Sequence, residues 1–362
     1  MTLTRRALLL SGSIGMGHDV QAEACATSLE AEGWSTDTVD VMRMPGYGFG
    51  AAGEAYYRGL QAIPGAFDAL HFAALRAGNR LALLMDAASR RTLVPRLRAY
   101  LDQNPPELAI SLFATGASAM SALADSYPAT RHVVFCADVT PHRLWVHDNV
   151  DLYLVTSSVA EAAVRRFQPD ARVHILPPAV RPGFYQPLSQ AEARTRLGVP
   201  LTERCVLLMS GGWGLGPVAA AAEALAAAGV QVLAVAGRNG SLERRLRAAA
   251  SHEERLHAFG FTDAVPELMA AADLVVTSAG SNTCVEARTV GRPLLLLDVI
   301  QGHGRDNVQH ELELGDAAVT SPGAADVVRT ALATLDRVKP RPAGPTRSQA
   351  EWEASFLSVL SG

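Results

Sequence analysis

Apolar segments that alternate with helical stretches along the whole chain restrict the fold more than any other feature. Strands that are joined through helices pair in parallel, so the sequence predicts an α/β fold with doubly wound sheets. In the first half, strands are predicted at residues 6–10, 36–41, 108–112, 132–135, 152–155 and 173–176. In the second half, they are predicted at residues 205–209, 230–236, 256–259, 274–276, 294–297 and 317–319.

The chain is predicted to form two domains. Its 362 residues are many for one core and comfortable for two α/β domains. A Pro-rich segment at residues 175–184 is typical of a linker. We therefore expect an N-terminal Rossmann-like domain over residues 1–180 and a C-terminal one over 181–340. Residues 46–100 are predicted to be a helical insert in the first domain, and residues 348–360 a helix that packs back on it.

Composition excludes several classes of protein. The net charge of −4 argues against a nucleic-acid partner, because binding to phosphate backbones needs clustered cations. No apolar run reaches transmembrane length, and the apolar N-terminus is predicted to be a first strand rather than a signal peptide. The four cysteines lack a CxxC pair and are expected to be buried free thiols. These features favour a cytoplasmic protein.

The segment 277–287 predicts an anion site. It follows an apolar strand, consists of small residues such as Gly280 and Ser281, and opens a helix near Asn282 and Thr283. The exposed N–H groups of a helix N-terminus bind anions. Glu286, about one turn into that helix, could reach hydroxyl groups of the molecule that carries the anion. A phosphate next to a diol indicates a nucleotide.

Two further Gly-rich turns follow strands, at residues 210–216, with Gly211 and Gly212, and at residues 11–18. The glycines of the turn at residues 11–18 do not keep the G-x-G-x-x-G spacing of a Rossmann dehydrogenase. Because ligands bind beyond the carboxyl ends of parallel strands, the active site is predicted in a cleft between the domains.

His18 and Asp138 are the candidate catalytic residues. His18 stands at the mouth of the first predicted helix, whose positive end would keep the imidazole neutral, as a base requires. The alternative is a histidine that only caps the helix. Asp138 follows an apolar strand and could orient His18 or take the proton itself.

The loop after Asp138 carries His142, Trp145 and His147, which lack the spacing of metal ligands, so no metal is expected. The alternative is a polar loop anchored by Trp145. A second polar cluster, residues 301–307, includes His303 and Asn307 and suits hydrogen bonds to a sugar. In its alternative interpretation, Asp306 is a helix cap.

These motifs together resemble, in order and over nearly the whole chain, the GT-B glycosyltransferases that include monogalactosyldiacylglycerol synthases and processive diacylglycerol glucosyltransferases. The Gly17-His18 turn resembles the family's Gly-Gly-His, and residues 138–147 its Asp-…-His-x-x-Trp-x-His signature. Residues 236–239 resemble its Cys-Gly-Arg-Asn, with Arg238 as the arginine. Phe261 and Thr262 lie in a stretch similar to its uracil-binding loop. Residues 278–286 match its Pro-Gly-Gly-x-Thr-x-x-Glu, and Asn307 its Gly-Gln-Glu-x-x-Asn.

The resemblance implies two Rossmann-like domains that face across a cleft, and an inverting, metal-independent transfer of a hexose from a UDP-sugar. The acceptor, a lipid such as diacylglycerol, would bind the N-terminal domain near Gly17, His142 and Trp145. His18 would be the leading candidate for the base, with Asp138 as its partner or rival. The donor would bind the C-terminal domain, with Glu286 on the ribose. The remaining donor-side residues would be Gly211, Gly212, Arg238, Phe261, Thr262, Gly280, Ser281, Asn282, Thr283, His303 and Asn307.

Departures from the family pattern keep other functions open. Ser281 replaces a glycine, and His303 and Gly304 replace the Gln-Glu that helps to choose the sugar. The alternatives are a soluble enzyme that acts on a hydrophobic small molecule, a UDP-sugar epimerase and a non-catalytic nucleotide-sugar sensor. The insert at residues 46–100 would distinguish a lipid acceptor from a soluble small molecule. A lipid enzyme, peripheral at the inner membrane face, should expose residues 81–85 as an apolar patch rimmed by arginines.

Overall fold

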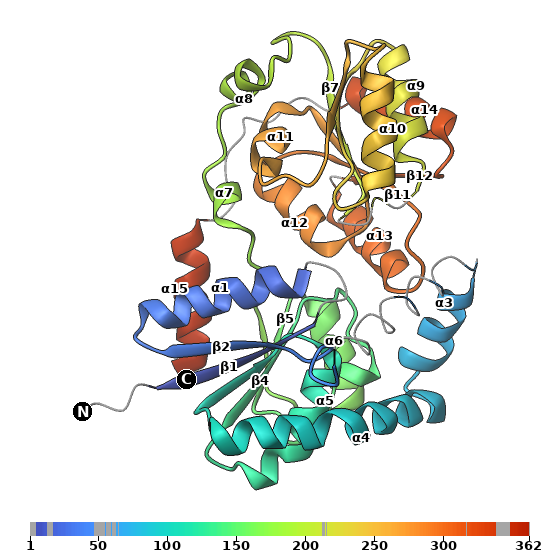
Figure 1. Ribbon diagram of the computed structural model, residues 1–362. Helices are drawn as coiled ribbons and strands as arrows, with labels where there is room; N and C mark the ends of the chain where they lie inside the picture. Colours follow the sequence, from blue (N-terminus) through green and yellow to red (C-terminus); the bar gives the residue numbers. More distant parts are fainter. Residues whose placement is uncertain are drawn as a thin grey trace. The chain divides into compact units, whose positions relative to one another are not determined.

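The computed structural model describes residues 5–12, 17–46, 55, 59, 63, 65–211, 214, 216–315, 317–337 and 348–361. The chain divides into two compact units (Figure 1). The first unit comprises Met1–Ala179, Gln301–His303 and Ala350–Gly362, and the second comprises Val180–Ile300 and Gly304–Gln349.

The first unit is built on a six-stranded parallel sheet in the order β2-β1-β3-β4-β5-β6. Its strands are β1 (Arg6–Ser11), β2 (Ser35–Asp40), β3 (Leu108–Ser111), β4 (Arg131–Cys136), β5 (Leu152–Val155) and β6 (Val173–Ile175). All six predicted strands are confirmed, and no bound differs from the prediction by more than one residue. The four central strands β1, β3, β4 and β5 were recognisable because strands buried on both faces are almost continuously apolar, whereas the edge strands β2 and β6 contain no buried residue.

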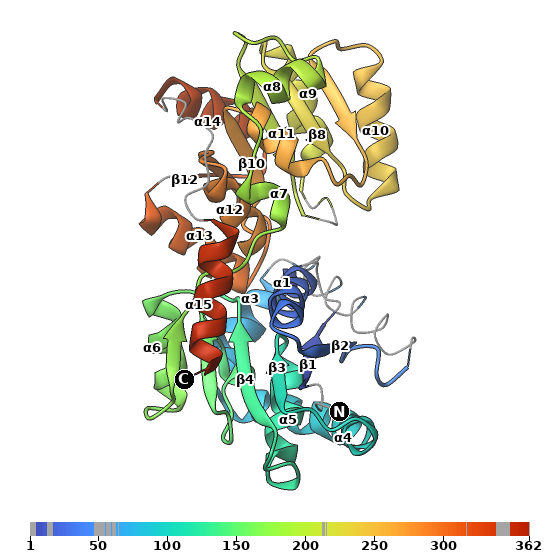
Figure 2. The ribbon, with the colours of Figure 1, turned by 90° about the vertical axis from the view of Figure 1, so that its left-hand side faces the viewer.

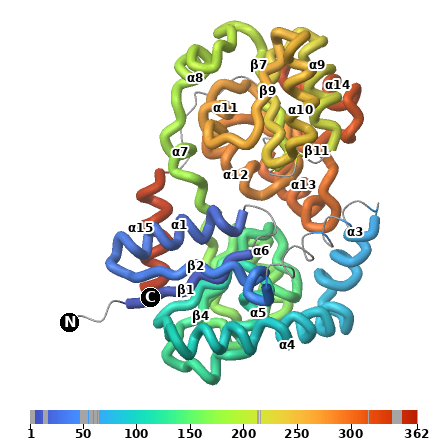
Figure 3. The backbone as a smooth tube through the Cα atoms, in the orientation of Figure 1, coloured from blue at the N-terminus to red at the C-terminus, as the bar shows by residue number. Residues whose placement is uncertain are grey.

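Helices cover both faces of this sheet (Figures 1 and 2). They are α1 (Gly17–Ala31), α4 (Arg80–Gln103), α5 (Ala114–Leu123), α6 (Ser158–Phe167) and α15 (Gln349–Ser361), while α3 (Ala66–Leu70) precedes α4 in the same unit. Side chains alternate along β1, so Leu9 packs with α1 and α15, while Leu8 and Leu10 pack with α4 and α5. Figure 3 traces α15, drawn in red, back to the unit that contains the first residues of the chain. There the indole N–H of Trp352 donates to the carbonyl of Pro177 at 2.9 Å.

The second unit repeats this architecture with the strand order β12-β11-β10-β7-β8-β9. Its strands are β7 (Cys205–Met209), β8 (Gln231–Val235), β9 (Leu256–Phe259), β10 (Leu274–Ser278), β11 (Leu294–Leu297) and β12 (Ala317–Thr320). They are parallel and agree with the six predicted segments.

One face of the second sheet packs against α7 (Pro182–Tyr185), α8 (Gln190–Leu197), α11 (Val265–Ala271) and α12 (Ser281–Thr289). The other face packs against α9 (Val218–Ala227), α10 (Gly240–Ala250) and α14 (Ala324–Arg337). Helix α13 (His303–Leu314) lies between β11 and β12 in the chain.

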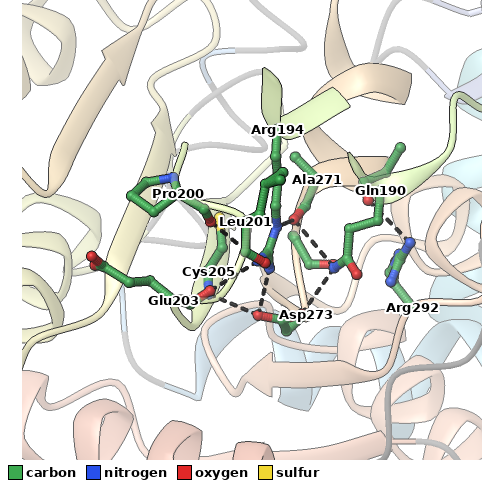
Figure 4. A network of polar contacts seen from close by, with 11 residues as sticks. Gln190, Arg194, Pro200, Leu201, Glu203, Cys205, Ala271, Asp273 and Arg292 are labelled. Carbon is green, nitrogen blue, oxygen red and sulfur yellow. Dashed lines mark hydrogen bonds and ion pairs between the residues drawn. The ribbon is translucent and has the colours of Figure 1, made fainter. Parts of the chain in front are cut away.

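A buried polar network fixes α8 to the start of β10 (Figure 4). The guanidinium of Arg194 donates to the carbonyls of Ala271 at 2.9 Å and Leu201 at 2.7 Å, and to a carboxylate oxygen of Asp273 at 2.8 Å. The same carboxylate accepts from the backbone N–H of Cys205, the first residue of β7. Asp273 therefore links α8 to the N-terminal ends of the adjacent strands β7 and β10. The Gly-rich segments follow the C-terminal ends of the same two strands.

All four cysteines are buried and unpaired by disulfides, as predicted: Cys25 and Cys136 in the first unit, and Cys205 and Cys284 in the second. Burial raises the pKa of each thiol. In the described part of the chain, no helix combines the length and apolar character needed to cross a bilayer.

Candidate active site

The three Gly-rich turns all follow strands at the switch points of the two sheets. In the first sheet, β1 has β2 on one side and β3 on the other, and in the second sheet β7 lies between β8 and β10. The Gly-rich segment before His18 follows β1 in the chain, and its residues 13–16 lie outside the described residues. The turns at residues 210–216 and 278–281 follow the neighbouring strands β7 and β10. Ligands of doubly wound sheets bind where the strand order reverses.

His18, the second residue of α1, is half-buried beside two aromatic rings. Its ring centroid lies 5.0 Å from that of Phe113, edge to face, and 6.2 Å from that of Trp145. Desolvation by burial lowers the pKa of His18. Three smaller effects raise it: the charge of Asp138, a hydrogen bond with the backbone of Leu112, and the charge of Asp19. The pKa of His18 is thus lowered in the predicted direction, and the largest cause is the loss of water on burial.

A neutral imidazole that donates its one N–H to the Leu112 carbonyl has an acceptor at its other nitrogen. It can therefore take a proton from a bound hydroxyl group, which is what a general base must do.

Asp138 follows β4 by two residues, and its carboxylate accepts a 2.7 Å hydrogen bond from the indole N–H of Trp145. Burial alone would raise the pKa of Asp138. His303, His142 and His18 and the Trp145 hydrogen bond outweigh that effect and leave the pKa lowered. The structure thus brings the two predicted catalytic residues into electrostatic contact, with a neutral imidazole beside an ionised carboxylate. Trp145 is the anchor of its loop and also the donor that holds Asp138.

Around Asp138 lies a group of histidines that the sequence only partly revealed. Desolvation lowers the pKa of His142 to about 4, although Asp138 opposes this. His71, which the sequence analysis missed, is buried in a single π-helical turn (His71–Leu75). Its ring centroid lies 6.1 Å from that of His142 and 6.4 Å from that of His303. Such turns are frequent at functional sites, but nothing in the apolar stretch around residue 71 indicates one.

His303, predicted on the donor side, belongs to the first unit with Gln301 and Gly302. Gly302 has a φ of +65°, and a Cβ there would lie 2.6 Å from the Phe67 ring, so this position requires glycine. Its N–H donates to Asp68 at 2.5 Å. The alternative interpretation of Asp306 as a helix cap is wrong, because α13 already begins at His303 and Asp306 lies within it.

In the second unit, the N-terminus of α12 has the features expected of an anion site. Its N-cap is Gly280, which has no side chain to accept from the first-turn N–H groups of Ser281, Asn282 and Thr283. A Cβ on Gly280 would meet no atom within 4 Å, so there is open space at this position. The amide of Asn307 donates to the carbonyl of Ala279 at 2.7 Å and so fixes the turn.

Buried hydroxyl groups at the same edge point to an additional polar partner. Within the described residues, the hydroxyls of Ser210, just after β7, and Thr277, in β10, make no hydrogen bond. Buried polar groups are normally paired with protein, water or ligand. This edge of the second sheet therefore suits a polar ligand.

Glu286 is buried in α12, and Arg181 Nε lies 3.2 Å from its Oε1. Desolvation raises its pKa to about 7, although Arg181 opposes the shift. The exposed Phe261 ring lies beneath the Arg238 guanidinium, with 5.0 Å between Cζ and the ring centroid. Thr262 accepts from the N–H of Ala264, just before α11.

Of the remaining predicted donor residues, Gly211 lies in the turn after β7, and Gly212 lies outside the described residues. Gly17 begins α1. Across the described ranges, no three His, Cys, Asp or Glu side chains come together as a metal site. His147 is held instead by Arg90, at 3.0 Å from its Nδ1, and by the Leu144 carbonyl, at 2.8 Å from its Nε2.

Comparisons with known proteins show which family and fold this chain is similar to. Residues 217–320 match the model of the glycosyltransferase family 28 C-terminal domain. A probable chloroplastic monogalactosyldiacylglycerol synthase of Glycine max is 32% identical over 200 residues, which are 51% of this chain and 38% of that protein. A processive diacylglycerol β-glucosyltransferase of Bacillus subtilis is 27% identical over 234 residues, 62% of this chain and 60% of that protein. The match thus spans less than two thirds of either relative.

The fold has close counterparts among solved structures. The crystal structure of MurG from Acinetobacter baumannii superposes with a TM-score of 0.57 at 13% identity, covering 99% of this chain and 100% of that one. Residues 217–320 are therefore a glycosyltransferase family 28 C-terminal domain, and the chain that carries them is a GT-B protein homologous to the monogalactosyldiacylglycerol synthases and the processive diacylglycerol glucosyltransferases.

Proposed function

We propose that this chain is an inverting glycosyltransferase that moves a hexose from a UDP-sugar to a hydroxyl group of a lipid such as diacylglycerol. The observation that carries the proposal is the neutral His18 imidazole in electrostatic contact with the Asp138 carboxylate. The names of the relatives support a hexose as the transferred group and diacylglycerol as the acceptor.

In the proposed reaction, the acceptor hydroxyl binds to the first unit and gives its proton to the unprotonated nitrogen of His18. The acceptor oxygen bonds to C1 of the hexose on the face opposite the leaving group, so the configuration at C1 inverts. The bond between C1 and the phosphate oxygen breaks, and its electron pair leaves with UDP. Asp138 stabilises the imidazolium that forms, or takes the proton itself in the alternative assignment.

The leaving UDP gains negative charge as that bond breaks. In this proposal the first-turn N–H groups of α12 stabilise the charge, since the N-terminus of a helix carries a partial positive charge. Ser281, Asn282 and Thr283 supply these groups, and no metal ion takes part.

Exposed apolar side chains on the insert support a lipid acceptor over a small soluble one. At the start of α4, Leu81 is 49%, Leu83 47% and Leu84 67% exposed. Nearby, the guanidinium of Arg76 lies 5.7 Å from the centre of the Phe72 ring. Exposed apolar side chains near a cation are a feature of proteins that bind at a membrane interface.

The test is UDP release from a panel of UDP-hexoses, with and without diacylglycerol vesicles. We expect vesicle-dependent release that is lost in His18→Ala and kept in His174→Ala, which removes an exposed histidine of the same unit. Donor binding without vesicle-dependent turnover would favour a soluble hydrophobic acceptor instead. If no UDP-sugar binds, the donor assignment is wrong.

A further inference from the structure

A buried ion pair joins the start of the second unit to the helix of the candidate anion site. Arg181, the N-cap residue of α7, approaches Glu286 of α12 with 3.2 Å between Nε and Oε1. The Glu286 side chain is 7% exposed and that of Arg181 29%. The guanidinium also lies over the fully buried Phe184 ring, with Cζ 5.0 Å from the centroid. Arg181 is therefore held in place on two sides.

This contact favours the ionised form of Glu286. Desolvation favours the neutral carboxyl, and Arg181 is the cation that opposes it, so the pKa stands at about 7 rather than higher. The other ionisable groups on this part of α12 are the Cys284 thiol, whose burial raises its pKa, and Arg288, which pairs with Glu311. The Glu286 carboxylate in turn helps to raise the pKa of the Cys284 thiol.

The geometry leaves Glu286 able to bind a second partner. Arg181 contacts Oε1 through a single N–H, and no described residue donates to Oε2. A carboxylate has about four lone-pair positions, so an ionised Glu286 can accept from two further hydroxyl groups. A protonated carboxyl would have fewer positions and would lose the stronger, charge-assisted bonds.

We propose that Arg181 is a positioning residue for the nucleotide donor: it pairs with the Glu286 carboxylate and aims it so that it can accept both hydroxyls of the ribose. This inference rests on the proposed function, because it assumes a nucleoside-diphosphate sugar. It assigns a role to a residue that the sequence places in the interdomain linker.

The experiment compares the binding of UDP-glucose with that of its 2′,3′-dideoxyribose counterpart, by calorimetry between pH 6 and pH 9. In Arg181→Gln, we expect UDP-glucose to bind about tenfold to a hundredfold more weakly at pH 7, the effect of one or two charge-assisted hydrogen bonds. The dideoxy compound should bind almost equally to both proteins. The midpoint of the pH dependence should move upward in Arg181→Gln and back toward the wild-type value in Arg181→Lys.

Arg288→Gln is the matched control. Arg288 lies on α12, the helix of Glu286, and pairs with Glu311. The side chains of this pair are 28% and 4% exposed, values close to the 29% and 7% of Arg181 and Glu286. The inference would be wrong if Arg181→Gln and Arg288→Gln weakened the binding of UDP-glucose equally. It would also be wrong if Arg181→Gln weakened the binding of the dideoxy compound as much as that of UDP-glucose. Either result would leave the proposed function standing. A wild-type protein that binds neither UDP-glucose nor UDP would overturn the proposed function instead. Should Arg181→Gln not fold, the same comparisons apply to Arg181→Lys, which retains the charge but loses the Nε contact.

Discussion

Replacing Arg194 with methionine should destabilise the second unit strongly. Methionine keeps an apolar chain of similar length but removes a guanidinium that donates to Asp273 and to four carbonyls, those of Ala271, Pro200, Leu201 and Glu203. Removing one partner of a buried ion pair costs roughly 3–5 kcal/mol. Asp273 would keep two donors, the amide of Gln190 at 2.9 Å and the N–H of Cys205 at 2.8 Å. We therefore expect the lower end, about 3 kcal/mol.

The assay is differential scanning calorimetry, in which the two units can give separate transitions. For a domain of this size, 1 kcal/mol corresponds to about 2–4 °C, so the transition of the second unit should fall by roughly 6–12 °C. The control is Arg204→Met, which breaks an ion pair with Asp336 whose side chains are 50% and 61% exposed. Such a surface pair contributes about 0–1 kcal/mol. Equal shifts in the two variants would refute the reasoning that burial and multiple carbonyl acceptors set the cost.

Three further predictions concern the proposed site. Trp145→Phe removes the indole N–H that donates to Asp138. Because that hydrogen bond helps to lower the pKa of the Asp138 carboxyl, the acidic limb of the pH profile of kcat should move to higher pH. An unmoved limb would contradict a role for Asp138 in the reaction. Leu84→Glu should weaken binding to diacylglycerol vesicles several-fold, since it places a charge on an exposed apolar side chain, whereas Leu201→Glu, at a 59% exposed leucine of the second unit, should not. The pKa of Glu286 is about 7 in the folded chain against an ordinary 4.5, so between these values the folded state holds a proton that the unfolded state has released. Stability measured in urea should therefore fall as pH rises through this window and level off above it, and Glu286→Gln should remove that slope.

The strands and turns were predictable because each depends on local sequence. A strand buried on both faces must be continuously apolar, and Leu294–Leu297 could hardly be anything else. The turn before Ser281 was equally predictable, because a run of small residues between a strand and a helix is typical of a tight turn. The positions of His18 and Asp138 followed from one rule, that the ends of parallel strands meet at one edge.

What the sequence did not reveal depends on contacts between distant segments. His71 lies in an apolar stretch, and only the folded chain brings it near His142 and His303. The cause of the His18 pKa shift is desolvation by side chains from other elements, such as Phe113 and Trp145. Glu286 was expected simply to face hydroxyl groups, whereas the structure pairs it with an arginine 105 positions away in the sequence. No local pattern encodes such a pairing.

The placement of the four thiols gives the protein a built-in set of reporters. Two lie in each unit, and all four are shielded from solvent with raised pKa values. A thiol-specific reagent can react only when the surrounding structure opens, because the thiolate is the reactive form and must reach solvent. Mass spectrometry of partly labelled protein would therefore time the opening of each unit separately, without an engineered probe. A donor that closes only the second unit would slow the labelling of Cys205 and Cys284 and leave Cys25 and Cys136 unchanged.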